Sequence, residues 1–176
     1  AVFISSNFLA TLDERQMHSC YAVRLKRGLI FDAKLFAAIK DCSDYTRLSA
    51  FVHRSVEIKN EVISQDPTEQ GLRKILNFGH TIGHAIEGYS LQHDETPLLH
   101  GEAIAIGMIC EGYLSHKFNG LAIAELEELV AVFNKHYPHY AFDSSSYTEL
   151  FDFMRNDKKN ESQKLGFSLL SEIGVC

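Results

Sequence analysis

The sequence predicts a mainly helical domain, with residues 1–176 forming a single unit. Only three prolines interrupt the chain, at positions 67, 97 and 138, and between them the apolar residues mostly recur at the spacing of an amphipathic helix. A content of 45% hydrophobic and 23% charged residues is ordinary for a globular domain, and 176 residues suffice for one packed core.

The first predicted elements are two amphipathic helices of different length. Leu35, Phe36 and Ile39 share one face of a short segment. A longer helical pattern runs from Leu48 to about Ser64. Both faces are apolar enough to pack against a core.

The next stretch predicts a helix start followed by a longer helix. Asp66 is a candidate N-terminal cap, and Pro67 fits the first turn. From residue 72 to about residue 89 the apolar pattern continues as one helix, which Gly79 and Gly83 interrupt. Each glycine costs roughly 1 kcal/mol in a helix interior. Two of them one turn apart therefore indicate that another helix or a ligand approaches the backbone closely.

The second half of the chain predicts further helices and an extended tail. Residues 90–97 are polar and turn-like, and the helix from about His100 to Phe118 is apolar almost all round, so it should be central. Asn119-Gly120 should end it. The remaining predicted elements are a helix over residues 121–137, a helix capped by residues 144–146 that runs toward Met154, and an extended tail over residues 164–173.

Charge and cysteine spacing argue against several classes of function. A net charge of -6 and a pI near 5.8 disfavour nucleic-acid binding, which usually depends on a basic surface. No run approaches the roughly 20 apolar residues of a membrane span, and residues 1–7 lack the features of a signal peptide. We therefore expect a cytoplasmic protein. The four cysteines lack CxxC spacing, which favours free thiols over a zinc knot or a disulfide framework.

The most informative residues are three histidines. His80 and His84 are four residues apart, so they lie on the same face of a helix. His100, on the next predicted helix, can complete a site for a divalent metal such as zinc or cobalt, since neutral imidazole is a common ligand. Two histidines at this spacing can equally be structural. The His-Gly-Glu sequence at residues 100–102 and the neighbouring glycines favour the metal site.

The same region resembles a known family. Residues 69–87, EQGLRKILNFGHTIGHAIE, and residues 100–108, HGEAIAIGM, are similar to the metal-binding half of 3-dehydroquinate synthase. The similarity extends to residues 8–12 and Arg15, and near the other end to residues 157–159, 166–170 and 173–174. This resemblance implies the helical C-terminal domain of the fold that dehydroquinate synthases share with iron-type alcohol dehydrogenases.

The resemblance also implies roles for matching residues. His80 and His100 correspond to two metal ligands of the family. His84 corresponds to a histidine that contacts substrate, and we expect His84 and Lys26 to be catalytic. The expected substrate-binding residues are Lys59, Glu69, Arg73, Asn77, Lys158 and Lys159. Several cations in one pocket suit an anionic sugar phosphate.

One position departs from the family pattern. The family's third metal ligand is a glutamate in an Ala-Glu-x-x-Lys segment, and residues 22–26 of this chain have Val23 there. Valine cannot coordinate a metal, so the ion should be held more weakly. Two histidines with water, or a carboxylate from Glu87 or Glu102, stay open as ligand sets.

The implied reaction is the phosphate-eliminating cyclisation of 3-deoxy-D-arabino-heptulosonate 7-phosphate to 3-dehydroquinate, a step of the shikimate pathway that uses NAD. No Gly-rich loop between a strand and a helix is found to cradle a dinucleotide. We therefore expect NAD to bind an N-terminal nucleotide-binding domain absent from this chain, which begins without Met. The isolated chain should be inactive, and the parent enzyme is expected to be a homodimer.

Three alternatives stay open. A related sugar-phosphate cyclase would use much of the same cation set. An iron-type polyol dehydrogenase would have little use for Lys26, Lys59 and Arg73. The third alternative is a non-catalytic paralogue retained for binding or assembly, and Val23 motivates it.

Overall fold

The computed structural model describes residues 5, 9, 11–42, 50–137, 139–156 and 165–176. Within these ranges the chain is helical, and the only β pairing is an isolated bridge between Glu172 and Val175. This confirms the predicted fold class. The helices are α1 (Glu14–Phe31), α2 (Ala33–Ile39), α3 (Val52–Gln65), the 3-10 helix η3 (Leu72–Asn77), α4 (His80–His93), α5 (His100–Phe118), α6 (Ile123–His136), the 3-10 helix η4 (Ser144–Ser146) and α7 (Tyr147–Asn156).

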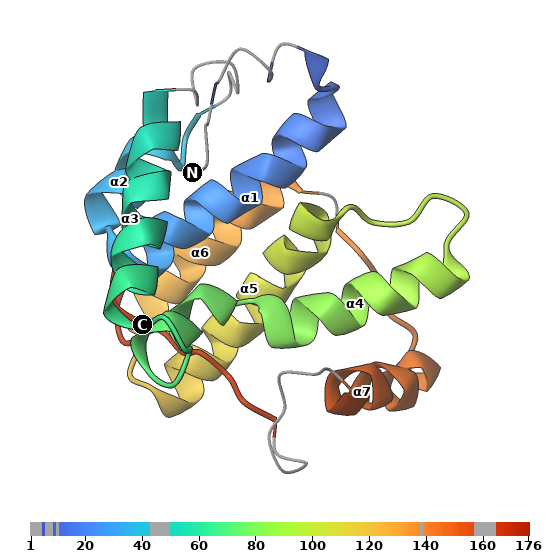
Figure 1. Ribbon diagram of the computed structural model, residues 1–176. Helices are drawn as coiled ribbons and strands as arrows, with labels where there is room; N and C mark the ends of the chain where they lie inside the picture. Colours follow the sequence, from blue (N-terminus) through green and yellow to red (C-terminus); the bar gives the residue numbers. More distant parts are fainter. Residues whose placement is uncertain (1–4, 6–8, 10, 43–49, 138, 157–164) are drawn as a thin grey trace.

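Helix α5 lies at the centre of the fold, in contact with α1, α4 and α6 (Figure 1). Helices α2 and α3 pack against α1 on one side of the molecule, and α7 packs against α4 on the other. Ile104 and Met108 of α5 are buried in the main core, and Ala103 belongs to a second core beneath α7. The prediction of a central helix over residues 100–118 is confirmed, because each side of it meets another helix.

Three glycines allow α4 and α5 to cross closely. A Cβ atom on Gly107 would lie 2.1 Å from the carbonyl oxygen of Gly79, and one on Gly83 would lie 2.6 Å from Cδ1 of Ile104. Real Cβ atoms do not approach other atoms so closely, so a side chain at position 107 would collide with the backbone of α4, and one at position 83 would displace Ile104. The close approach expected from the glycine spacing is therefore between two helices.

The segment over residues 72–89 differs from the prediction, because it is not one helix. It forms the 3-10 helix η3, then a break, and only then α4. At the break Gly79 takes a left-handed conformation with φ of 79°, which residues other than glycine rarely adopt. The break turns the chain so that His80 begins α4.

Asp66 also differs from its predicted role as the cap of a following helix. It stands at the C-terminal end of α3, and its carboxylate accepts hydrogen bonds from the backbone N–H groups of Gly71 (2.7 Å) and Arg73 (3.0 Å). These backbone hydrogen bonds, led by that of Gly71, hold the pKa of Asp66 below its ordinary value. Asp66 therefore organises the loop before η3.

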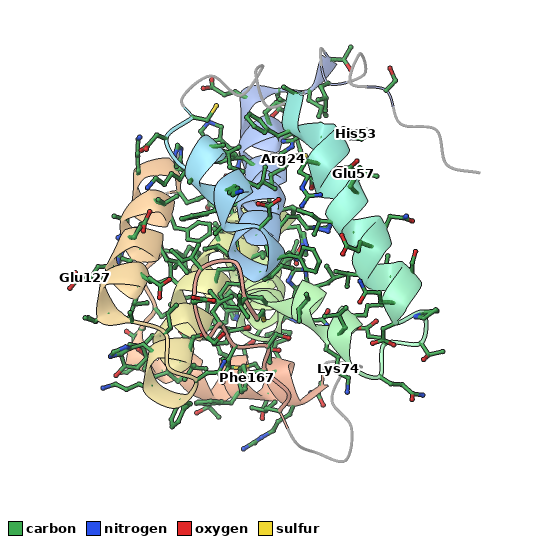
Figure 2. The ribbon with its side chains drawn as sticks, turned by 90° about the vertical axis from the view of Figure 1, so that its left-hand side faces the viewer. Arg24, His53, Glu57, Lys74, Glu127 and Phe167 are labelled. Carbon is green, nitrogen blue, oxygen red and sulfur yellow. The ribbon has the colours of Figure 1, made fainter. Side chains whose placement is uncertain are left out.

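Helix α1 was not predicted, and its buried face contains cations. Arg24 and Arg27 are each 8% exposed and Lys26 is 3% exposed. In Figure 2, Arg24 lies among the helices, whereas the label of Glu127 stands at the edge of the molecule. Three buried nitrogens, Nη1 of Arg24 and Nε and Nη1 of Arg27, have no hydrogen-bond partner within the described part of the chain. Burial accordingly lowers the pKa of both guanidinium groups.

The remaining helices lie close to their predicted positions, but α4 continues to His93, through residues that were predicted to be turn-like. The short helix around Phe36 is α2, the longer one that follows is α3, and the helices predicted over residues 121–137 and near Met154 are α6 and α7. No disulfide joins the four cysteines. In the described part of the chain, no helix has both the length and the apolar character needed to cross a bilayer.

Candidate metal centre

Three imidazoles meet where α4 crosses the start of α5. His80 and His84 come from the first two turns of α4, and His100 is the first residue of α5. Their ring centroids are 5.0 Å apart for His80 and His84, 5.5 Å for His80 and His100, and 5.7 Å for His84 and His100. One nitrogen from each ring lies within 4.8 Å of the other two. Each nitrogen would approach a divalent ion at about 2 Å, so small rotations of the rings would bring the three nitrogens to one ion.

Two of the rings are held by neighbouring acceptors. Nδ1 of His100 lies 2.9 Å from Oε2 of Glu87, and Nδ1 of His80 lies 3.2 Å from the carbonyl oxygen of Phe78. An N–H at Nδ1 satisfies both contacts and directs Nε2 of His100 toward a metal. Nε2 of His80 lies 3.2 Å from Nζ of Lys26, so this ammonium must move aside before Nε2 of His80 can bind an ion. Carboxylates and carbonyls orient metal-binding histidines in this way in many proteins. The donor set and its supports thus fit zinc or cobalt.

A buried ammonium group lies beside the histidines. Nζ of Lys26 donates a hydrogen bond to the carbonyl oxygen of Leu76 (2.9 Å) and lies 3.2 Å from Nε2 of His80. Lys26 is on α1, so three helices contribute to the site. A fixed cation here is placed to bind an anionic group of a ligand close to the metal position.

The register of α1 places Val23 on the face directed at this site. Ser19 of α1 contacts the start of α5, since its Oγ accepts a hydrogen bond from the N–H of Gly101 at 2.9 Å. Lys26 contacts His80 from the same helix. Val23 lies one turn from each of these contacts, and its side chain is half-buried. The face of α1 that looks toward the histidines therefore offers no ligand at this position.

The two nearby carboxylates are both engaged. Glu102 accepts hydrogen bonds from Nε (2.9 Å) and Nη2 (2.7 Å) of Arg15 and from the N–H of Leu99 (2.7 Å). Although burial acts to raise it, these bonds hold the pKa of Glu102 below its ordinary value. Oε2 of Glu87 contacts Nδ1 of His100 at 2.9 Å. Among the described residues, the donor cluster consists of the three histidines alone.

The residues expected to bind substrate are partly gathered in a polar network. Nδ2 of Asn77 donates to Oε1 of Glu69 at 2.8 Å, and Nε of Arg73 lies 3.5 Å from Oε2 of Glu69. Glu69 has a φ of 60°, the only left-handed non-glycine residue in the described ranges. Such strained backbone is common at ligand sites. Lys26 links this network to the histidines, because it binds the carbonyl of Leu76, next to Asn77.

The other expected cations are not in this network. Lys59 is exposed on α3 and makes no hydrogen bond or ion pair with the described residues. Lys158 and Lys159 lie outside the described residues. The geometry thus brings together Lys26, Glu69, Arg73 and Asn77, whereas Lys59 lies apart from them.

Sequence reasoning missed the supporting role of two glutamates. Glu87, which the sequence offered only as a possible metal ligand, lies one turn beyond His84 and contacts Nδ1 of His100. Glu111 is fully buried, and its carboxylate accepts a hydrogen bond from the N–H of Gly79 at 2.8 Å. Burial raises the pKa of Glu111 to about 7. An isolated acid within an apolar helix was the available signal.

A helical domain in which three imidazoles and a buried ammonium converge at a helix crossing has the features of a divalent-metal-binding domain. The match to known proteins is more specific. A family profile described as 3-dehydroquinate synthase C-terminal matches residues 21–160. The chain belongs to this family.

Curated relatives share this sequence across nearly all of the chain. The 3-dehydroquinate synthase of Parabacteroides distasonis is 42% identical over 177 residues, which cover 98% of this chain and 50% of that protein. The 3-dehydroquinate synthase of Listeria welshimeri is 38% identical over 180 residues, covering 99% of this chain and 48% of the relative. The chain therefore spans about half the length of the curated relatives it matches.

Solved structures of related cyclases share the fold. A 2-epi-5-epi-valiolone synthase from Streptomyces hygroscopicus, with NAD+ and Zn2+ bound, superposes with a TM-score of 0.79 at 25% identity and covers 98% of this chain and 49% of its own. A 2-deoxy-scyllo-inosose synthase complexed with carbaglucose-6-phosphate, NAD+ and Co2+ gives a TM-score of 0.75 at 24% identity. The superposition covers 97% of this chain and 48% of the synthase. At the latter identity only the fold can be compared.

Proposed function

We propose that this chain is the metal- and substrate-binding half of a 3-dehydroquinate synthase, the enzyme that converts 3-deoxy-D-arabino-heptulosonate 7-phosphate to 3-dehydroquinate with loss of phosphate. The observation that carries the proposal is the convergence of His80, His84 and His100 beside Lys26 in a chain of this family. The curated relatives named for this reaction are more similar in sequence than the solved cyclases. This difference favours the dehydroquinate-forming reaction.

In this proposal His80 and His100 are metal ligands. A bound zinc or cobalt ion would hold and polarise a substrate hydroxyl. His84 is close enough to both rings to exchange protons with a substrate bound there, and it can also serve as a third ligand because Val23 offers none. Lys26 would fix an anionic group of the substrate next to His80.

The remaining polar residues would hold the charged ends of the substrate. Arg73 suits the planar pairing of a carboxylate, and Glu69 and Asn77 would position it from the same network. Lys59 is exposed on α3, so its long side chain is available to a phosphate. Lys158 and Lys159 are assigned to the same task on the family resemblance alone.

The redox cofactor would be NAD, bound by a separate N-terminal nucleotide-binding domain. The support is indirect, since the neighbouring cyclase structure from Streptomyces holds NAD+ and the chain covers 49% of that protein. We propose further that residues 1–176 form one domain, that the parent enzyme is a cytoplasmic homodimer, and that this half is inactive alone.

A specific observation supports a second candidate, a non-catalytic paralogue. Val23 occupies the face of α1 directed at the histidines, and no carboxylate joins their cluster in the described part of the chain. A related sugar-phosphate cyclase is the other alternative, because the Streptomyces neighbour shares the fold at 25% identity. An iron-type polyol dehydrogenase has no such support, because Lys26 and Arg73 have little use in it.

A fusion protein tests the proposed function. The chain is joined to the N-terminal half of the Parabacteroides distasonis relative, and phosphate release from the heptulosonate phosphate is measured with NAD and Co2+. Activity of the fusion, and none of the chain alone, supports the proposal. Activity only with Val23→Glu indicates the non-catalytic paralogue. An inactive fusion in both forms, beside an active intact relative, refutes the assignment.

A further inference from the structure

Helix α4, which carries two of the three histidines, has no cap of its own. Its N-cap residue is Gly79, which has no side chain to accept hydrogen bonds from the first turn. Uncapped N–H groups at a helix start are costly when they are buried. Substituting a capping residue is blocked, because a Cβ atom on Gly79 would lie 2.3 Å from Cγ of Met108.

The cap comes instead from Glu111 of α5. Oε2 of Glu111 accepts a hydrogen bond from the N–H of Gly79 (2.8 Å), and Oε1 accepts one from the N–H of Ile82 (3.3 Å). The two oxygens thus bind the backbone on both sides of His80. A carboxylate at this end also interacts favourably with the dipole of α4.

Helix α5 therefore holds both sides of the metal centre. It provides His100 at its first turn and, farther along, the carboxylate that fixes the start of α4. The contact between Gly107 and Gly79 sets how closely the helices approach. Hydrogen bonds to two separate N–H groups add a constraint on the rotation of α4, and this rotation decides where the His80 and His84 rings point.

Capping a helix with a buried carboxylate is unfavourable for stability. Glu111 is 0% exposed, and a buried charge costs stability unless it is well compensated. Among the described residues no salt bridge neutralises it, although the charge of Lys26 acts on it. Within the described ranges the side chain of Glu111 binds only backbone N–H groups around His80. Its unfavourable burial is therefore best explained if it fixes the position of His80.

We propose that Glu111 is a positioning residue for the metal centre, which acts by fixing the first turn of α4 and hence the rings of His80 and His84. The inference rests on the proposed function only for the identity of the ion. Glu111 itself would touch neither metal nor substrate.

The test compares Co2+ affinity in three variants of the chain, measured by calorimetry and by the visible absorption of Co2+. Glu111→Met removes both acceptors and should weaken binding about 10-fold or more, the usual effect of losing an orienting residue. Glu111→Gln keeps one acceptor oxygen and should give a smaller loss. The matched control is Ser115→Ala, one turn farther along α5, where an equally buried Oγ donates to the carbonyl of Glu111 and accepts from the N–H of Leu170.

Ser115→Ala should lower the melting temperature and leave Co2+ affinity unchanged. Equal loss of stability in Glu111→Met and Ser115→Ala, with unchanged Co2+ affinity and spectrum in both, would overturn the proposal. Imidazole NMR resonances of the metal-free chain provide a second readout: Glu111→Met should shift those of His80 and His84, and Ser115→Ala should not. If the wild-type chain binds no Co2+, the proposed function fails, and the NMR comparison still decides the role of Glu111.

Discussion

The buried carboxyl of Glu111 should make the stability of this domain depend on pH between about 4.5 and 7. Burial raises the pKa of Glu111 from 4.5 to about 7 in the folded state, against the hydrogen bonds that Gly79 and Ile82 donate. The folded state therefore binds the proton more tightly than the unfolded state. The stabilisation is complete below pH 4.5 and is lost as the pH rises through about 7.

The raised pKa changes the free energy of unfolding by about 3 kcal/mol, since each unit of pKa difference between the folded and unfolded states is worth about 1.4 kcal/mol. Urea denaturation at pH 5 and pH 8 measures this difference. His136 acts in the opposite direction, because burial lowers its pKa, so the wild type is compared with Glu111→Gln, which does not titrate. The wild type should lose about 3 kcal/mol more than Glu111→Gln between these pH values. Equal losses in both proteins would refute the reasoning.

Three further predictions concern other positions. Arg27→Met should stabilise the fold by about 1–3 kcal/mol in urea denaturation, because it removes a buried guanidinium with two unpaired nitrogens; an unchanged or lower stability contradicts this. Gly107→Ala should cost about 3 kcal/mol or more in the same assay, since its Cβ would meet the Gly79 carbonyl at 2.1 Å; a cost below about 1 kcal/mol would mean that α4 and α5 can separate freely. Glu87→Gln should weaken Co2+ binding about 10-fold by calorimetry, because an amide orients His100 less strongly; unchanged binding would show that Glu87 has no such role.

The parts of the fold that the sequence predicted best are those whose pattern is local. The limits of α5 were correct because its mostly small and apolar residues continue from His100 to a clear Asn-Gly stop. The pairing of His80 with His84 needed only helical spacing. His100, on the next predicted helix, was indicated by its His-Gly-Glu context, and the resemblance to the family added Lys26 from α1.

The parts that were missed depend on contacts distant in sequence. The break before α4 is stabilised by Glu111 and by the close contact with Gly107, neither of which is visible in the local pattern of residues 72–89. Helix α1 was missed because its buried face includes the cations Arg24, Lys26 and Arg27, so its apolar residues form no clear amphipathic pattern. Sequence spacing cannot distinguish a buried cation from a solvated one.

The most direct test of the metal centre is a Co2+ titration followed by visible absorption. The wild-type chain should bind one ion per chain, and His80→Ala should lose saturable binding, because His80 is central to the imidazole cluster. His93→Ala is the matched control: His93 ends the same helix and pairs with Glu149 at 3.0 Å, away from the cluster, so its loss should not matter. Equal binding by wild type and His80→Ala, or no saturable binding by the wild type, would contradict the convergence of these histidines on one ion.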